Sequence, residues 1–88
     1  MIEGSRGGVT RARILSLLLN SPLNPHQIAR KLGMNYRSVI HHLELLERNG
    51  IVQRIGRGYG APYTLSETAV SYEEILRKSI KTILGEER

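Results

Sequence analysis

The side chains of this 88-residue chain that are best suited to chemistry form one polar run near its centre. Arginine, amide, hydroxyl and imidazole groups dominate the run, and carboxylates follow only at Glu44 and Glu47. A helix that merely faces solvent favours acids in its first turn, where the helix dipole is positive, but this run has Arg37 there. Such groups hydrogen-bond to base edges and phosphates, so the run predicts a surface that contacts nucleic acid. Its members are Asn35, Tyr36, Arg37, Ser38, His41 and His42.

Individual contacts follow from the chemistry of each group. Arg37 suits guanine, Asn35 suits adenine or phosphate, and Tyr36 suits a thymine methyl. The serine and the two histidines suit bases or phosphates. Because imidazole gains charge below about pH 6.5, we expect the affinity for DNA to rise below that pH. Taken singly, each of these residues is more typical of an ordinary solvated surface.

Two helices joined by a tight turn are predicted over residues 24–50. Asn24 is a good N-cap with Pro directly after it and Gln three residues later, and Gly33 supplies the left-handed residue that ends this helix. Asn35 caps the second helix, and Gly50 ends it. The pattern is a helix-turn-helix with the polar run on the exposed side of its second helix. The predicted buried positions are Ile28, Ala29, Leu32, Val39, Leu43 and Leu46.

A β-hairpin is predicted next, with strands at 51–55 and 63–65 and a glycine-rich loop between them. Alternating glycines also occur in phosphate cradles, but a cradle links a strand to a helix, whereas this loop links two strands. We therefore expect a wing that approaches a sugar-phosphate backbone through Arg54, Arg57 and Tyr59, with Arg57 at the tip as the best candidate. An ordinary solvent-exposed hairpin is the alternative.

Helices are also predicted at both ends of the chain. Thr10 can cap a helix that covers the following ten residues, and Leu23 then forms a short strand beside the wing. Ser66 can cap the last helix, and a second box that starts at Ser71 allows a break near Val70.

The apolar content of these two helices exceeds what the core of a small domain covers. It is accounted for either by packing within one subunit or by contact with a second subunit, and both can hold at once. We favour a dimer, since the near-neutral charge of the last helix removes the repulsion that would oppose it. The predicted dimer contacts are Leu17, Leu19, Tyr72, Ile75, Leu76, Ile80 and Ile83.

Two motifs resemble a known family. Ser38-Val-Ile-His-His-Leu43, followed by Leu46-Glu-Arg-Asn-Gly-Ile-Val52, is similar to the recognition helix and exit segment of ArsR-like winged-helix transcriptional regulators. The resemblance covers about residues 10 to 70 and implies a hairpin wing and a dimer formed through the C-terminal helix. ArsR-like metal sensors use Cys or His/Asp/Glu sets that this sequence lacks, so the resemblance does not extend to metal sensing.

Charge and composition agree with this interpretation. The net charge is +5, and residues 1–65 carry nine Lys/Arg against three Glu, while residues 66–88 carry four against five. This asymmetry is typical of a nucleic-acid-binding module joined to an interaction helix. The chain has no Cys, no apolar run long enough to span a membrane, and no signal-peptide pattern, so a cytoplasmic protein is expected.

Catalytic, metal and stacking sites are not expected. The chain has no Asp and no Cys, and its Glu residues fall on predicted surfaces. His41 and His42 are adjacent on a helix and point about 100° apart, which prevents chelation of one ion, and His26 lies on another helix. The four Tyr are too scattered in the sequence for a base-stacking platform. We expect no enzymatic activity, cofactor or metal.

The fold expected is mainly α with a small β-hairpin: a winged helix-turn-helix with a C-terminal dimerisation helix. Its parts are a flexible arm at 1–8, the DNA-binding domain at 9–66 and the dimerisation helix at 67–88. The function expected is sequence-specific binding of double-stranded DNA as a homodimeric transcriptional regulator, with no membrane partner and no identifiable small-molecule effector. The alternatives are a sequence-neutral architectural DNA-binding protein and a winged helix used as a protein-interaction module.

Overall fold

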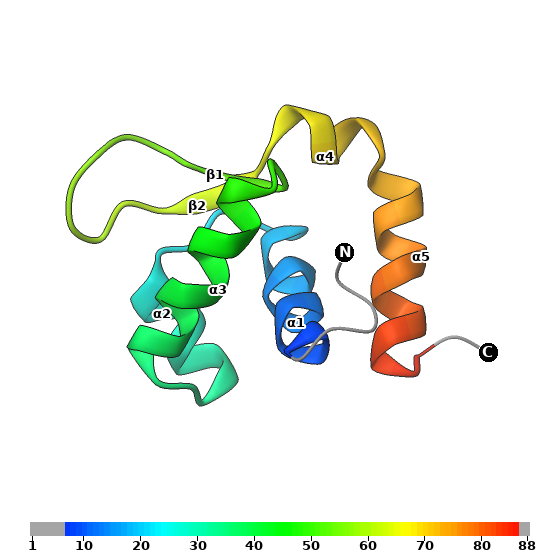
Figure 1. The fold of residues 1–88 in the computed structure, drawn as a ribbon, viewed down its shortest axis with the longest axis horizontal. Coiled ribbons are helices and arrows are strands. Elements are labelled where there is room, and N and C mark those ends of the chain that lie inside the picture. The colour runs from blue at the N-terminus through cyan, green and yellow to red at the C-terminus, as the bar shows by residue number, and fades with distance from the viewer. Residues whose placement is uncertain (1–6, 87–88) are drawn as a thin grey trace.

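Helices pack beside a short antiparallel hairpin in the computed structural model, which describes residues 7–86. Figure 1 shows the hairpin loop extending on the side of α2 and α3, while α5 stands on the opposite side next to α1. No helix within residues 7–86 is both long and apolar enough to cross a membrane. The elements are α1 (Gly8–Leu18), α2 (Pro25–Leu32), α3 (Tyr36–Arg48), β1 (Val52–Arg54), β2 (Tyr63–Leu65), α4 (Glu67–Ser71) and α5 (Glu73–Leu84).

The predicted helix-turn-helix is confirmed together with its caps. The Asn24 side chain accepts a hydrogen bond from the Gln27 backbone, and the Gln27 side chain accepts one from the Asn24 backbone, both at 2.8 Å. Gly33 ends α2 in the left-handed region, at φ 64°. Asn35 caps α3 by accepting from the backbone N–H of Arg37 at 2.7 Å. A three-residue turn therefore joins α2 to α3, and both helix starts are set by local hydrogen bonds.

The prediction that Thr10 caps the first helix is wrong. α1 begins at Gly8 with Gly7 as its cap, and the Gly7 carbonyl accepts from the Arg11 backbone at 3.0 Å. Gly7 has φ 84°, a conformation that glycine adopts without strain, so the helix extends one turn further toward the N-terminus. Gly8, assigned above to a flexible arm, is thus helical and buried, and the rest of that arm (1–6) lies outside the described residues.

The C-terminal segment breaks close to the position that the sequence allowed, although not through the predicted box. α4 ends at Ser71 and α5 begins at Glu73. Ser71 does not cap α5, because its hydroxyl donates back to the Thr68 carbonyl at 2.6 Å. Ser66 does cap α4, since its Oγ accepts from the Ala69 backbone at 3.0 Å, and it also donates to the Gly50 carbonyl at 2.7 Å.

One continuous core joins the helices to the hairpin. α1 packs against α5 along its length and also against α2 and β2. Leu23 forms the predicted short bridge with Tyr63, and the hairpin register pairs Val52 with Leu65. The helix-turn-helix is thereby held on one side of α1 and α5 on another. The buried apolar residues are Ala12, Ile14, Leu15, Leu18, Leu23, Ile28, Ala29, Val39, Leu43, Leu46, Val52, Tyr63, Leu65 and Ile80.

Replacement of Ser66 by alanine should destabilise the fold, because this hydroxyl both caps α4 and ties it to the end of α3. Loss of a helix cap typically costs about 0.5–2 kcal/mol, and we expect a value in the upper half of that range. Ser71→Ala is the matched control, because it removes an exposed hydroxyl bonded only within its own turn. Urea unfolding measures both variants, and equal losses would contradict the bridging role of Ser66.

Candidate nucleic-acid interface

The N-terminal half of α3 presents a polar surface because its opposite face is buried. Val39 and Leu43 are inaccessible to solvent, whereas Arg37, Ser38 and His41 are exposed. Asn35 is also exposed, but its side-chain oxygen is used in the cap, which leaves its amide nitrogen to donate elsewhere. Three of the predicted contact residues, Arg37, Ser38 and His41, thus point freely outward from one helix.

His42 is placed differently from the rest of the polar run. It is half-buried, and its Nδ1 lies 3.2 Å from Nη1 of Arg11, a buried residue of α1 that is 6% exposed. Burial lowers the pKa of His42, and the positive charges of Arg11 and His41 lower it further. The imidazole is therefore part of the α1–α3 contact, and it does not supply the gain of charge near pH 6.5 that the sequence suggested.

Three aromatic rings meet where the hairpin loop reaches the helix-turn-helix. His26 of α2 stacks on Tyr36 of α3, with ring centroids 4.2 Å apart and planes 17° apart. Tyr59 in the loop packs edge-on against His26 at 5.3 Å, and its hydroxyl shares a hydrogen bond with His26 Nε2. We call His26, Tyr36 and Tyr59 the ring cluster. Tyr36 and Tyr59 are 23 positions apart in the sequence, yet their ring centroids lie 6.4 Å apart.

No functional role was predicted for His26, which was placed only on a different helix from His41 and His42. Its contact with Tyr59 spans 33 positions in the sequence, and only the path of the glycine-rich loop brings the two together. No local pattern signals such a contact. Pro25, Tyr36, Arg54 and Tyr59 also line a small hollow of about 210 Å³ between the loop and α3.

Further basic side chains are exposed on the elements next to α3 in the sequence. Arg54 and Arg57 of the hairpin are exposed, as are Arg30 and Lys31 in the last turn of α2. Among the described residues, no three His, Cys, Asp or Glu side chains are grouped as metal ligands would be. The chemistry that this surface offers is thus hydrogen bonding and positive charge, which suits a polyanion.

A model of the bacterial arsR family of regulatory proteins matches residues 8–54, more than half of the chain. The chain belongs to the arsR family. The matched region contains α1, the helix-turn-helix and β1, so the resemblance inferred from the recognition-helix motif is confirmed. The arsR-family protein described here is therefore a winged helix-turn-helix protein from a family of transcriptional regulators.

Solved structures share this fold. HlyU from Vibrio vulnificus CMCP6, described as a transcriptional regulator, is 28% identical with a TM-score of 0.65, over 78% of this chain and 73% of HlyU. Mb0332 from Mycobacterium bovis, described as a homodimeric winged helix-turn-helix DNA-binding domain, is 25% identical with a TM-score of 0.68, over 82% of this chain and 67% of its own. ZitR from Lactococcus lactis in complex with DNA is 20% identical with a TM-score of 0.69, over 94% of this chain and 59% of ZitR, and shows the fold alone. No curated protein sequence matches the chain.

The residues predicted to form a dimer contact divide into three groups. Tyr72 and Ile75 are 60% and 64% exposed, while Ile80 is 3% exposed and belongs to the core of its own chain. The other four, Leu17, Leu19, Leu76 and Ile83, are half-buried at the edge of that core.

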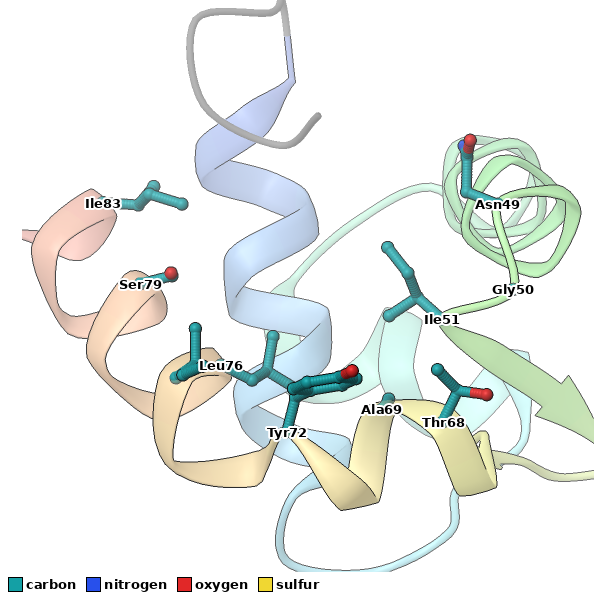
Figure 2. A pocket seen from close by; sticks show the side chains of 10 residues that line it. Asn49, Gly50, Ile51, Thr68, Ala69, Tyr72, Leu76, Ser79 and Ile83 are labelled. Carbon is teal, nitrogen blue, oxygen red and sulfur yellow. The ribbon is translucent and has the colours of Figure 1, made fainter.

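An apolar groove of about 390 Å³ lies between the end of α3 and the α4–α5 segment. Figure 2 shows Leu76 of α5 and Ile51 facing this space from opposite sides, with Tyr72 between them. Ile75 also lines the groove, so both exposed members of the predicted contact belong to it.

The arsR-family protein should lose stability as the pH falls below about 6.5. Because the pKa of His42 is lowered in the folded state, the unfolded chain binds more protons in the window between that lowered pKa and 6.5. The contribution of His42 to the free energy of unfolding is therefore fully present above pH 6.5 and declines as the pH falls toward the lowered pKa. His42→Gln should flatten the dependence of the unfolding free energy on pH, while the exposed His41→Gln should retain most of the slope. Equal slopes for wild type and His42→Gln would contradict the assignment.

Proposed function

We propose that the arsR-family protein is a homodimeric transcriptional regulator that binds double-stranded DNA sequence-specifically through α3 and the hairpin. The ring cluster carries the proposal, because the contact between Tyr36 and Tyr59 brings the hairpin loop to the N-terminus of α3. Arg37 directly follows Tyr36, Arg57 lies two positions before Tyr59, and both arginines are exposed, so charged groups of both elements flank this contact. A duplex requires such a pairing, since one element enters the groove and another contacts the flanking backbone.

Family membership and relatives support DNA as the partner. HlyU is described as a transcriptional regulator and Mb0332 as a homodimeric DNA-binding domain, and this chain covers most of each. The net charge of +5 favours association with a polyanion. The soluble interior of a cell, where chromosomal DNA lies, is the compartment that this function requires.

The proposed contacts with DNA follow from the length of α3 and from the side chains that it exposes. α3 has 13 residues, which at about 1.5 Å per residue is about 20 Å, and its exposed N-terminal side chains fit the major groove. Arg37 would read guanine edges, while Ser38, His41 and the free amide nitrogen of Asn35 would contact bases or phosphates. The loop arginines, Arg54 and Arg57, would hold the adjacent backbone. In a two-fold dimer the half-sites would lie about 34 Å apart.

Selection of bound fragments from random duplex DNA, at a defined salt concentration, tests the proposal directly. We expect it to recover a site with two-fold symmetry. Comparable affinity for random and selected DNA would instead indicate a sequence-neutral architectural protein. Affinity no better than about 10⁻⁴ M at physiological salt would indicate a protein-interaction module.

Arg57→Ala and Arg37→Ala should weaken binding in different ways. Arg57→Ala should weaken binding to all sequences alike and lower the salt slope by about one, because it removes a phosphate contact. Arg37→Ala should relax preference at one base pair per half-site, at a cost of about 1–3 kcal/mol for the preferred sequence. Titrations against the selected site and a shuffled site at several salt concentrations measure both effects.

Lys78→Ala controls for the loss of one positive charge, because Lys78 lies exposed on α5, far in the sequence from the DNA-contacting elements. It should leave the salt slope nearly unchanged. If Arg57→Ala changed sequence preference and kept the salt slope, the assignment of the hairpin as a backbone-contacting wing would be wrong.

Ile75→Glu should abolish the dimer, because it places a carboxylate on the exposed apolar side of α5 that lines the groove. The monomer fold should survive, since Ile75 is largely exposed. Lys81→Glu puts the same carboxylate about 120° or more around the helix from the groove residues and should stay dimeric. Sedimentation equilibrium measures the mass of each variant, and a dimeric Ile75→Glu variant would contradict the proposed contact.

A further inference from the structure

We propose that the ring cluster is a latch that holds the hairpin loop against the helix-turn-helix and thereby positions Arg57 for DNA. The inference rests on the proposed function and adds residues to it: His26 and Tyr59 act as positioning residues. Tyr59 was predicted above as a direct contact to DNA. In the latch its hydroxyl instead shares a hydrogen bond with His26 of the same chain.

The latch joins three separate elements at one point. His26 is the second residue of α2, Tyr36 is the first residue of α3, and Tyr59 lies in the loop between β1 and β2. The stacked pair of His26 and Tyr36 forms a rigid base on the two helix starts. Tyr59 contacts this base through the edge of its ring and through its hydroxyl, which shares a hydrogen bond with His26 Nε2.

The loop depends on this contact because the hydrogen bonds of its own backbone do not attach it to the helices. Gly56, Gly58 and Gly60 have φ of 79°, 97° and 82°, values that glycine adopts freely and other residues rarely do. A hydrogen bond from the Ile55 backbone to the Pro62 carbonyl at 2.8 Å closes the base of the loop. A second backbone hydrogen bond, from Ala61 to the Gly58 carbonyl at 3.3 Å, closes a turn around Tyr59. Neither bond attaches the loop to the helices, and the three glycines leave its orientation relative to them variable, so the contact of Tyr59 selects one orientation.

The hydroxyl of Tyr59 matters more than its apolar area. The residue is 83% exposed, so burial contributes little to holding it. Apart from its hydrogen bond, the ring makes only an edge contact with His26 and a tilted contact with Tyr36, so we expect loss of the hydrogen bond to release it. Arg57 lies two positions away in the same glycine-rich loop, so its position relative to α3 is set by the same contact. Ordering the loop before DNA arrives removes an entropic cost from binding.

NMR order parameters of the backbone amides of residues 56–61 test the latch without DNA. Tyr59→Phe keeps the ring and removes the hydroxyl, and we expect the order parameters to fall from rigid values near 0.85 to below about 0.6. Tyr36→Phe is the matched control, because it also removes one tyrosine hydroxyl but keeps the ring that stacks on His26, and the loop should stay ordered. Unchanged order parameters in Tyr59→Phe would overturn the latch.

A double-mutant cycle separates positioning from direct contact with DNA. Tyr59→Phe should weaken DNA binding about fivefold in the wild-type background, the typical contribution of a single hydrogen bond, and should have no effect in the Arg57→Ala background. An equal loss in both backgrounds would show that the hydroxyl contacts DNA itself and would overturn the positioning role, as would no loss in either. If the wild-type protein bound no DNA, the proposed function would fail, while the order parameters would still decide whether the latch exists.

Discussion

Burial of one apolar stripe on α3 decides what the rest of that helix presents to solvent. Val39, Leu43 and Leu46 lie in the core, where α3 packs against α2 and β1, and this orientation turns Arg37 and His41 outward. A rotation of α3 by one residue position, about 100°, would bring apolar side chains into water and polar ones into the core. The polar surface is therefore a consequence of core packing, and its orientation is as rigid as the core itself.

A polar contact reinforces this orientation from the side of α1. Arg11 is buried, and a buried charge is tolerated in proteins only where hydrogen bonds offset its loss of hydration. The acceptor on α3 is Nδ1 of His42, which can serve only while the imidazole is neutral at that nitrogen. The lowered pKa of His42 keeps it in that state near neutral pH. An added Cβ at Gly7 would come within 2.8 Å of the same ring, so the start of α1 is also fitted to it.

The helix caps could be predicted from the sequence because they depend only on neighbours within about four positions. Asn24, Asn35 and Ser66 cap helices because their side chains reach a backbone N–H two or three residues ahead, and this requires no knowledge of the fold. The contacts of His42 with Arg11 and of His26 with Tyr59 span 31 and 33 positions. They arise from the way in which helices and loop pack together, so residue types alone do not reveal them. For the same reason, amphipathic spacing on α5 did not separate Ile80, which is in the core, from Ile75, which is exposed.

The geometry of α3 links the two proposed interfaces. Its N-terminal half carries the surface proposed to contact DNA, whereas Asn49, Gly50 and Ile51, directly after its C-terminus, line the apolar groove beside α5. The hydrogen bond from Ser66 to the Gly50 carbonyl ties α4 to the same point. A second subunit seated in the groove would thus contact one end of the rigid helix whose other end faces DNA. Half-site spacing requires such a fixed relation, because a flexible connection between the two interfaces would not hold both reading helices in register.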